Sequence, residues 1–281
     1  MIIDMHTHIF PPEVIANRAH FAARDPWFAE LYGDPQARMA TAEDVVASLT
    51  AHGIDRAVTF GFGWRDAGLI RLANDYVIDA VRRHPDRLIG FAVIQPTAPA
   101  DALAEITRAY AAGLRGIGEL MPHGQGYRLS DTTLLAPIAE AAQALDLIVL
   151  THASEPVGHH YPGKGDVSPA DLLAFAAAFP QLRVVAAHWG GGLPFYHLMP
   201  EVAELLRHWW FDTAASPFLY TPAVWRAAAL CVGSDKILWA SDYPLIRHPR
   251  MLRYLAAGGL TPEESAQVLG GNAAHVLGLD G

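Results

Sequence analysis

The chain opens with Met1-Ile2-Ile3-Asp4-Met5-His6-Thr7-His8, an apolar run that ends in two histidines separated by one residue. Side chains alternate between the faces of a strand, so this pattern predicts that Asp4, His6 and His8 project the same way. Two neutral imidazoles on one face can bind one metal ion, and Asp4 is predicted to support them by accepting a second ring N–H. An ordinary strand whose histidines face solvent has the same pattern. Other parts of the chain are therefore needed to distinguish a metal site from such a strand.

Further short apolar runs follow, separated by longer amphipathic segments. Together with the first run they cover residues 2–8, 57–60, 88–94, 114–118, 147–151, 184–187, 209–213 and 237–241. Their β-branched and aromatic residues, with little polar alternation, favour strands that are buried on both faces. The sequence therefore predicts eight strands.

The segments between these runs carry helix signals. The clearest predicted helices span residues 68–83, 99–112 and 131–145. Ser168-Pro169-Ala170-Asp171 and Thr261-Pro262-Glu263-Glu264 each combine an N-cap residue, a proline at the first helical position and an acidic first turn. Both segments are predicted to begin helices.

Eight strands alternating with helices over about 250 residues predict an α/β fold of the (β/α)8 TIM-barrel type. We expect a single domain over residues 1–281, with an irregular excursion at about 11–38. An open doubly wound sheet is the alternative fold. Such a sheet ordinarily has a glycine-rich nucleotide turn after its first strand, where this chain has His6-Thr7-His8. Gly190-Gly191-Gly192 lacks the Lys and Ser/Thr of a phosphate loop, which favours the barrel.

Composition narrows the classes of function. A net charge of −9 without a basic stripe argues against nucleic acid or an anionic membrane as partner. Cys231 is the only cysteine, so a bound metal would need nitrogen and oxygen ligands. There is no apolar run of about 20 residues and no signal-type N-terminus. We expect a cytoplasmic protein that acts on a small molecule, and a homodimer is left open.

The predicted strand ends carry further metal-ligating side chains. In a barrel of this kind the active site lies at the C-terminal ends of the strands. Four later apolar runs end in Glu119, His152, His188 and Asp242. Taken singly, these residues could be a salt-bridged carboxylate, core histidines and a turn residue. Together with His6 and His8 they give six potential ligands from five strand ends, which favours a metal site.

Several segments resemble the amidohydrolase superfamily, and within it amidohydrolase family 2, the branch that contains aminocarboxymuconate-semialdehyde decarboxylase and related decarboxylases and hydrolases. The resemblance runs from residue 2 to residue 279. The segments that carry it are Asp4-Met5-His6-Thr7-His8, Ala187-His188-Trp189-Gly190-Gly191-Gly192, Ser241-Asp242-Tyr243-Pro244 and Gly271-Asn272-Ala273-Ala274-His275-Val276-Leu277-Gly278-Leu279.

The resemblance implies a divalent metal, usually Zn²⁺, held by His6, His8, His152 and Asp242. It implies that His188 is either a ligand of a second metal or a base that acts on water. Relatives with two metals commonly bridge them with a carboxylated lysine at the end of the fourth strand. Neither lysine of this chain, Lys164 or Lys236, occupies that position. Glu119 occupies that position instead. It is expected to be a metal ligand or a bridge between two metals, or else the site holds one ion only. One ion is the favoured interpretation, and two ions remain open.

Metal-dependent hydrolysis is the leading prediction for the reaction. A metal with an open position lowers the pKa of bound water to roughly 7. The water would attack an ester, lactone or amide of a small cyclic or aromatic substrate, with His188 and Asp242 as catalytic residues that move the proton.

Non-oxidative decarboxylation by a zinc-dependent carboxy-lyase is the alternative. Arg247 would then bind an acidic group of the substrate, and the alternative for Arg247 is a solvated surface residue. For either reaction, Trp189 is the aromatic residue expected to contact an aromatic or cyclic substrate. A barrel that binds metal without catalysis is the third hypothesis. The mixture of histidines and carboxylates beneath aromatic-rich loops argues against it, because a sequestering site favours a closed set of ligands.

Overall fold

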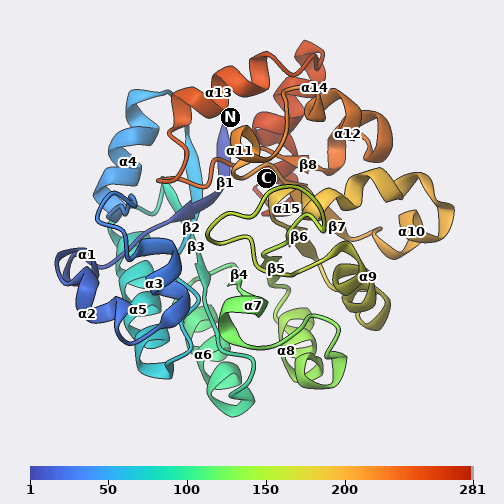
Figure 1. Cartoon of the computed structure of the whole chain (residues 1–281). Helices are drawn as coiled ribbons and strands as arrows, with labels where there is room; N and C mark the ends of the chain where they lie inside the picture. The colour runs from blue at the N-terminus through green and yellow to red at the C-terminus, as the bar shows by residue number, and fades with distance from the viewer. Residues whose placement is uncertain (280–281) are drawn as a thin grey trace.

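The computed structural model describes residues 1–279 and shows a barrel of eight parallel strands with helices around it (Figure 1). The strands follow one another around the barrel in chain order, and each pairs in parallel with the next. They are β1 (Ile3–His8), β2 (Arg56–Phe60), β3 (Leu88–Ala92), β4 (Gly116–Leu120), β5 (Ile148–Thr151), β6 (Val184–Ala186), β7 (Trp209–Asp212) and β8 (Ile237–Leu238). The predicted (β/α)8 barrel is confirmed.

The barrel closes between β1 and the segment that follows β8. The His8 N–H donates to the Tyr243 carbonyl at 2.8 Å, and the Asp242 N–H donates to the His6 carbonyl at 3.0 Å. Thr7 and Tyr243 form a parallel bridge. We call these two segments, His6–His8 and Asp242–Tyr243, the closure seam. Two predicted metal-site segments therefore lie side by side at the seam.

The last predicted strand is shorter than the sequence suggested. Residues 237–241 form one apolar run, but β8 covers only Ile237–Leu238. Beyond it, the Trp239 N–H donates to the Val268 carbonyl and the Ala240 N–H donates to Thr213 Oγ1. These partners lie outside the strand ladder, so regular pairing ends at Leu238.

Helices surround the barrel. The α-helices of six or more residues after the excursion at 11–38 are α4 (Ala42–Ala51), α5 (Ala67–Arg83), α6 (Pro99–Ala111), α8 (Thr132–Ala144), α9 (Pro169–Ala178), α10 (Pro200–Leu205), α12 (Val224–Val232) and α13 (His248–Ala256). The other helical segments are α7 (Pro122–Gln125), α11 (Ser216–Leu219), α14 (Pro262–Ala266), α15 (Asn272–Val276), the 3₁₀ segments η1 (His188–Leu198) and η2 (Ser234–Lys236), and the π segment η3 (Gln267–Gly271). Within residues 1–279, none has both the length and the apolarity to cross a membrane.

Side-chain caps explain where several helices start. Ser168 and Asp171 form a reciprocal capping box at α9, and Thr261 and Glu264 form another at α14. In each box, two backbone N–H groups at the start of the helix have no acceptor within the helix. Each of them donates a hydrogen bond to a side-chain oxygen instead. Both predicted helix starts are confirmed.

The excursion at 11–38 contains three short helices, where the sequence suggested irregular chain. They are α1 (Pro12–Ala16), α2 (Arg18–Ala22) and α3 (Pro26–Tyr32). Asp25 begins α3 by accepting hydrogen bonds from the N–H groups of Trp27 and Phe28. Phe28 is fully buried and stacks on Trp64, with ring centroids 4.6 Å apart. Aromatic burial therefore fixes this segment beside the barrel.

Candidate metal centre

All six side chains predicted from the strand ends meet at the C-terminal end of the barrel. Each is at most 8% exposed, and the set is His6 and His8 on β1, Glu119 on β4, His152 after β5, His188 after β6, and Asp242 after β8. Buried titratable groups persist only when they are paired, hydrogen-bonded or coordinated to a metal. Their convergence makes this end of the barrel the candidate site.

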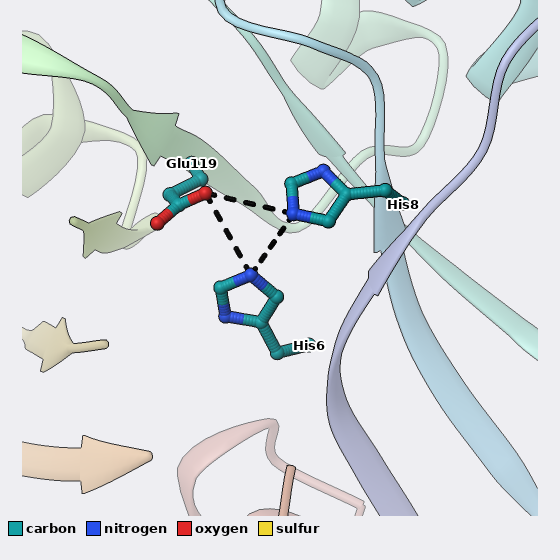
Figure 2. A group of neighbouring side chains, drawn as sticks. All are labelled: His6, His8 and Glu119. Atoms are coloured by element: carbon teal, nitrogen blue, oxygen red, sulfur yellow. Dashed lines mark hydrogen bonds and ion pairs between the residues drawn. The ribbon is translucent and has the colours of Figure 1, made fainter. Parts of the chain in front are cut away.

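The two histidines of β1 and the carboxylate of β4 face one another (Figure 2). His6 Nε2 lies 3.1 Å from His8 Nε2, and Glu119 Oε2 lies 3.6 Å from each of these nitrogens. Asp242 Oδ1 lies 3.7 Å from His6 Nε2 and 3.3 Å from His8 Nε2. Tetrahedral ligands at about 2.0–2.1 Å from an ion are separated by roughly 3.3 Å. His6 and His8 are therefore spaced from each of the two carboxylates as ligands of one divalent cation would be.

His152 lies on the other side of Glu119. Its Nδ1 is 3.1 Å from Glu119 Oε1, and His188 Nε2 is 3.5 Å from the same oxygen. Glu119 thus turns one oxygen toward His6 and His8 and the other toward His152 and His188. The donor atoms of Glu119, His152 and His188 lie within 4.8 Å of one another, as do those of His6, His188 and Asp242. Glu119 therefore lies between the two pairs of histidines, whereas its role was left open by the sequence.

A one-residue bulge in β1 changes the direction in which its side chains project. Asp4 pairs with Ala57 and Thr7 pairs with Thr59, so β1 advances three residues while β2 advances two. β4 has the same irregularity opposite β5, between Ile117 and Leu120, the interval that contains Glu119. Bulges redirect side chains and are frequent next to active sites. Both strands that supply the donors in Figure 2 are bulged at the donor.

The bulge also changes the role of Asp4. The alternation rule placed Asp4 on the face of His6, where its carboxylate would support a ring. Instead the carboxylate accepts hydrogen bonds from the backbone N–H of His6, from Ser241 and from His248. The extra residue between Asp4 and Thr7 breaks the alternation, so Asp4 does not bond the ring of His6 or His8, and the imidazole that it contacts is that of His248.

Asp212 takes the supporting role and was missed. Its Oδ2 lies 2.9 Å from His6 Nδ1, and its Oδ1 accepts the N–H groups of His188 and Ala214 at 3.0 Å each. A carboxylate only accepts, so His6 Nδ1 carries a proton, and Nε2 is the nitrogen that faces the site and would bind a metal there. Asp212 ends β7, and the strand-end rule that found Asp242 would have found it too.

Neither predicted substrate contact lines the cavity above the site. Trp189 is fully buried, donates from Nε1 to Ser216 Oγ at 2.7 Å and packs edge-on against Trp225. Arg247 is exposed and precedes α13. Arg38, from the segment after α3, is the arginine that lines the cavity. Both residues are close in sequence to a predicted metal-site residue, but this closeness did not predict that they line the cavity.

The cavity has a volume of about 400 Å³ and opens above the donors. His8, Glu119, His152, His188 and Asp242 form its floor. Apolar and aromatic side chains form much of its wall, and they include Leu31, Tyr32, Phe62, Met121, Phe218, Leu219 and Leu245. Such a cavity suits a small ring with one or two polar groups.

Nearby carboxylates raise the pKa of two of the histidines, His188 and His6. Burial lowers the pKa of His188, but Glu119, Asp242 and Asp212 outweigh this effect and raise the pKa to about 10. For His6, burial also lowers the pKa, and Asp212, Glu119 and Asp242 raise it to about 9. Burial favours a protonated Glu119, yet the adjacent histidines keep its pKa well below the usual value. Without a metal, His6 and His188 are therefore imidazolium ions beside carboxylates, and a cation bound at His6 Nε2 would displace the proton there.

Comparison with known proteins agrees with this arrangement. The amidohydrolase family model matches residues 3–279. The chain is 25% identical to 2-amino-3-carboxymuconate-6-semialdehyde decarboxylase of Dictyostelium discoideum over 79% of this chain and 71% of that protein. It is 24% identical to L-fucono-1,5-lactonase of Burkholderia ambifaria over 99% of this chain and 96% of that protein.

Solved structures show the same fold. 5-Carboxyvanillate decarboxylase of Sphingomonas paucimobilis superposes with a TM-score of 0.79 at 21% identity, covering 98% of each chain. The corresponding enzyme of Novosphingobium aromaticivorans, solved with manganese and 4-hydroxy-3-methoxy-5-nitrobenzoic acid, gives 0.79 at 20% identity, covering 99% of this chain and 96% of that chain. The barrel, the donor set at its C-terminal end and the family match over nearly the whole chain lead to one conclusion: the protein is an enzyme of the amidohydrolase family.

Proposed function

We propose that this enzyme is a metal-dependent decarboxylase that removes CO2 from a small aromatic carboxylate without an oxidant. The observation that carries the proposal is the position of His188, an imidazole that lies beside the metal donors and lines an apolar cavity, where it can serve as the proton donor. The relatives that decarboxylate aromatic carboxylates support this reaction better than the hydrolysis predicted first.

The proposed cofactor is one divalent ion among His6, His8, Glu119 and Asp242. Zn²⁺ suits imidazole and carboxylate ligands, and Mn²⁺ is present in similar decarboxylase structures. When bound, the ion supplies positive charge that holds an anionic group of the substrate. His152 and His188 face the other oxygen of Glu119, where a second ion would be held.

The protein's own residues perform the proton transfer. The His188 imidazolium donates its proton to the ring carbon that bears the carboxylate, and a pair of ring π electrons forms the new C–H bond. The bond between that carbon and the carboxylate then breaks, its electron pair restores the aromatic ring, and CO2 leaves. One proton is consumed and nothing is oxidised. Asp242 and Glu119, whose carboxylates stabilise the cation on His188, favour its reprotonation from solvent.

The cavity orients the ring. Tyr32, Phe62 and Met121 supply flat or flexible apolar surface, which excludes water from the carbon that receives the proton. Arg38 lines the same cavity and can bind a second acidic or phenolic oxygen of the substrate. The proposed substrate class is therefore a small aromatic carboxylate with a further oxygen substituent.

Lactone hydrolysis is the second candidate, because the lactonase relative matches 99% of the chain. In that reaction Asp242 would take a proton from the attacking water and return it to the leaving oxygen.

One assay separates the two reactions. Purified protein loaded with Mn²⁺ or Zn²⁺ is supplied with 2,6-dihydroxybenzoate, 5-carboxyvanillate or L-fucono-1,5-lactone, and released CO2 and newly formed carboxylic acid are both measured. CO2 in stoichiometric amount with the decarboxylated ring supports the proposal. New acid from the lactone without CO2 from either aromatic substrate would overturn it in favour of hydrolysis.

A further inference from the structure

Behind the metal donors lies a fully buried pair, Asp4 and His248. Asp4 Oδ1 accepts the N–H of His6 at 3.1 Å and the N–H of Ser241 at 3.0 Å. Its Oδ2 accepts the Ser241 hydroxyl and lies 3.0 Å from His248 Nε2. Because the carboxylate only accepts, Nε2 carries the proton, and Nδ1 accepts from the Ser48 hydroxyl at 2.8 Å. Asp4 and His248 are both 0% exposed, so the bonds that Asp4 makes are shielded from water, whereas the bond to Ser48 is part-buried.

This pair holds both neighbours of Asp242. Ser241 is bound to Asp4, and the ring of Tyr243 stacks on His248 with centroids 4.8 Å apart and planes 11° apart. The Tyr243 N–H also donates to Ser241 Oγ at 3.0 Å. Asp242 itself has φ = +64°, a conformation that is costly for a residue with a side chain and needs its surroundings to impose it.

The same pair holds the bulge of β1. The Asp4 carboxylate accepts the N–H of His6 inside the bulged interval, and this bond sets the direction in which His6 leaves the strand. Asp4 and Ser241 are 237 positions apart in the chain. One carboxylate therefore fixes the backbone on both sides of the closure seam, and His248 fixes that carboxylate.

We propose that Asp4 and His248 are positioning residues that hold His6 and Asp242 at metal-binding separation. The inference rests on the metal site proposed above. A residue that only contributes to the folded core would change thermal stability alone. A positioning residue also changes the dissociation constant for the metal, because misplaced ligands bind an ion less tightly.

The test compares His248→Gln with His248→Asn. The two side chains carry the same amide, but only the longer one places its nitrogen where Nε2 lies and can still donate to Asp4. Metal-free protein is titrated with Mn²⁺, and free Mn²⁺ is followed by its electron paramagnetic resonance signal. We expect the Gln variant to bind within about threefold of the wild type and the Asn variant to bind about tenfold or more weakly.

A matched control is Asn74→Ala. Asn74 is a fully buried amide that bonds Val93 and Glu105 and lies outside this network. Its loss should lower the melting temperature with no change in Mn²⁺ affinity.

The outcomes separate this inference from the proposed function. A wild-type protein that binds neither Mn²⁺ nor Zn²⁺ overturns both. Tight binding by the wild type, with equal dissociation constants for the Gln and Asn variants, overturns the positioning role alone. If the Asn variant does not fold, Ser48→Ala replaces it. That variant frees Nδ1 of His248 and is expected to bind Mn²⁺ more weakly than the Gln variant does; a dissociation constant equal to that of the wild type then overturns the role.

Discussion

Asp212 holds His6 by a 2.9 Å hydrogen bond between Oδ2 and Nδ1, and both side chains are fully buried. This bond decides which nitrogen of His6 carries a proton and which faces Glu119 and Asp242. We expect Asp212→Asn to weaken metal binding about 10- to 100-fold, because a neutral amide makes the imidazole less basic. The dissociation constant for Mn²⁺ measures the effect. Asp146→Asn, which removes a surface carboxylate paired with Arg183, should bind as the wild type does.

Metal content tests the ligands directly. Elemental analysis should show bound metal in the wild type and its loss in His6→Ala and Asp242→Ala, because each variant removes one of four donors. Full metal content in both variants would contradict the proposed site.

His188 should be needed for turnover more than for metal binding. We expect His188→Asn to keep most of the metal and to lose roughly 10²- to 10⁴-fold in kcat, because the proton donor is gone. Elemental analysis and CO2 release, measured on the same preparation, separate the two effects. An unchanged rate removes the catalytic role.

The pKa of His6 predicts how the stability of the metal-free protein depends on pH. Burial lowers this pKa, and Asp212 and the other carboxylates raise it from 6.5 to about 9. The folded protein then holds the proton more tightly than the unfolded chain, so the stabilisation is complete below pH 6.5 and is lost as the pH rises through 9. We expect the melting temperature of metal-free protein to fall over this interval. A flat profile would show that His6 is not protonated in the folded protein.

Arg38 and Arg247 make a matched pair for substrate recognition. Arg38 lines the cavity and Arg247 does not. For an aromatic carboxylate with a second acidic group, Arg38→Gln should raise KM about tenfold with little change in kcat, because one charged hydrogen bond contributes about 1.4 kcal/mol or more. Arg247→Gln should leave both constants unchanged. The reverse result would restore the sequence-based expectation for Arg247.

The sequence predicted the barrel and six of the converging side chains because both depend on local pattern. Apolar runs mark the strands, and the residue after each run lies at the C-terminal end. Asp4 could not be assigned in this way, because a bulge depends on how β1 pairs with β2. Trp189 lies next to His188 in sequence, but its φ of +57° belongs to a turn that accompanies burial of the ring against Trp225. The contacts of both residues arise from tertiary packing.

The closure seam also sets when the site can exist during synthesis. His6 and His8 are synthesised before Asp242, which follows the eighth strand. The hydrogen bond between Asp242 and the carbonyl of His6 forms only when the last strand docks against the first. Until Asp242 has been synthesised, His6 and His8 lack one of the carboxylates that face them in the folded barrel. All the proposed metal donors come together only after the barrel has closed.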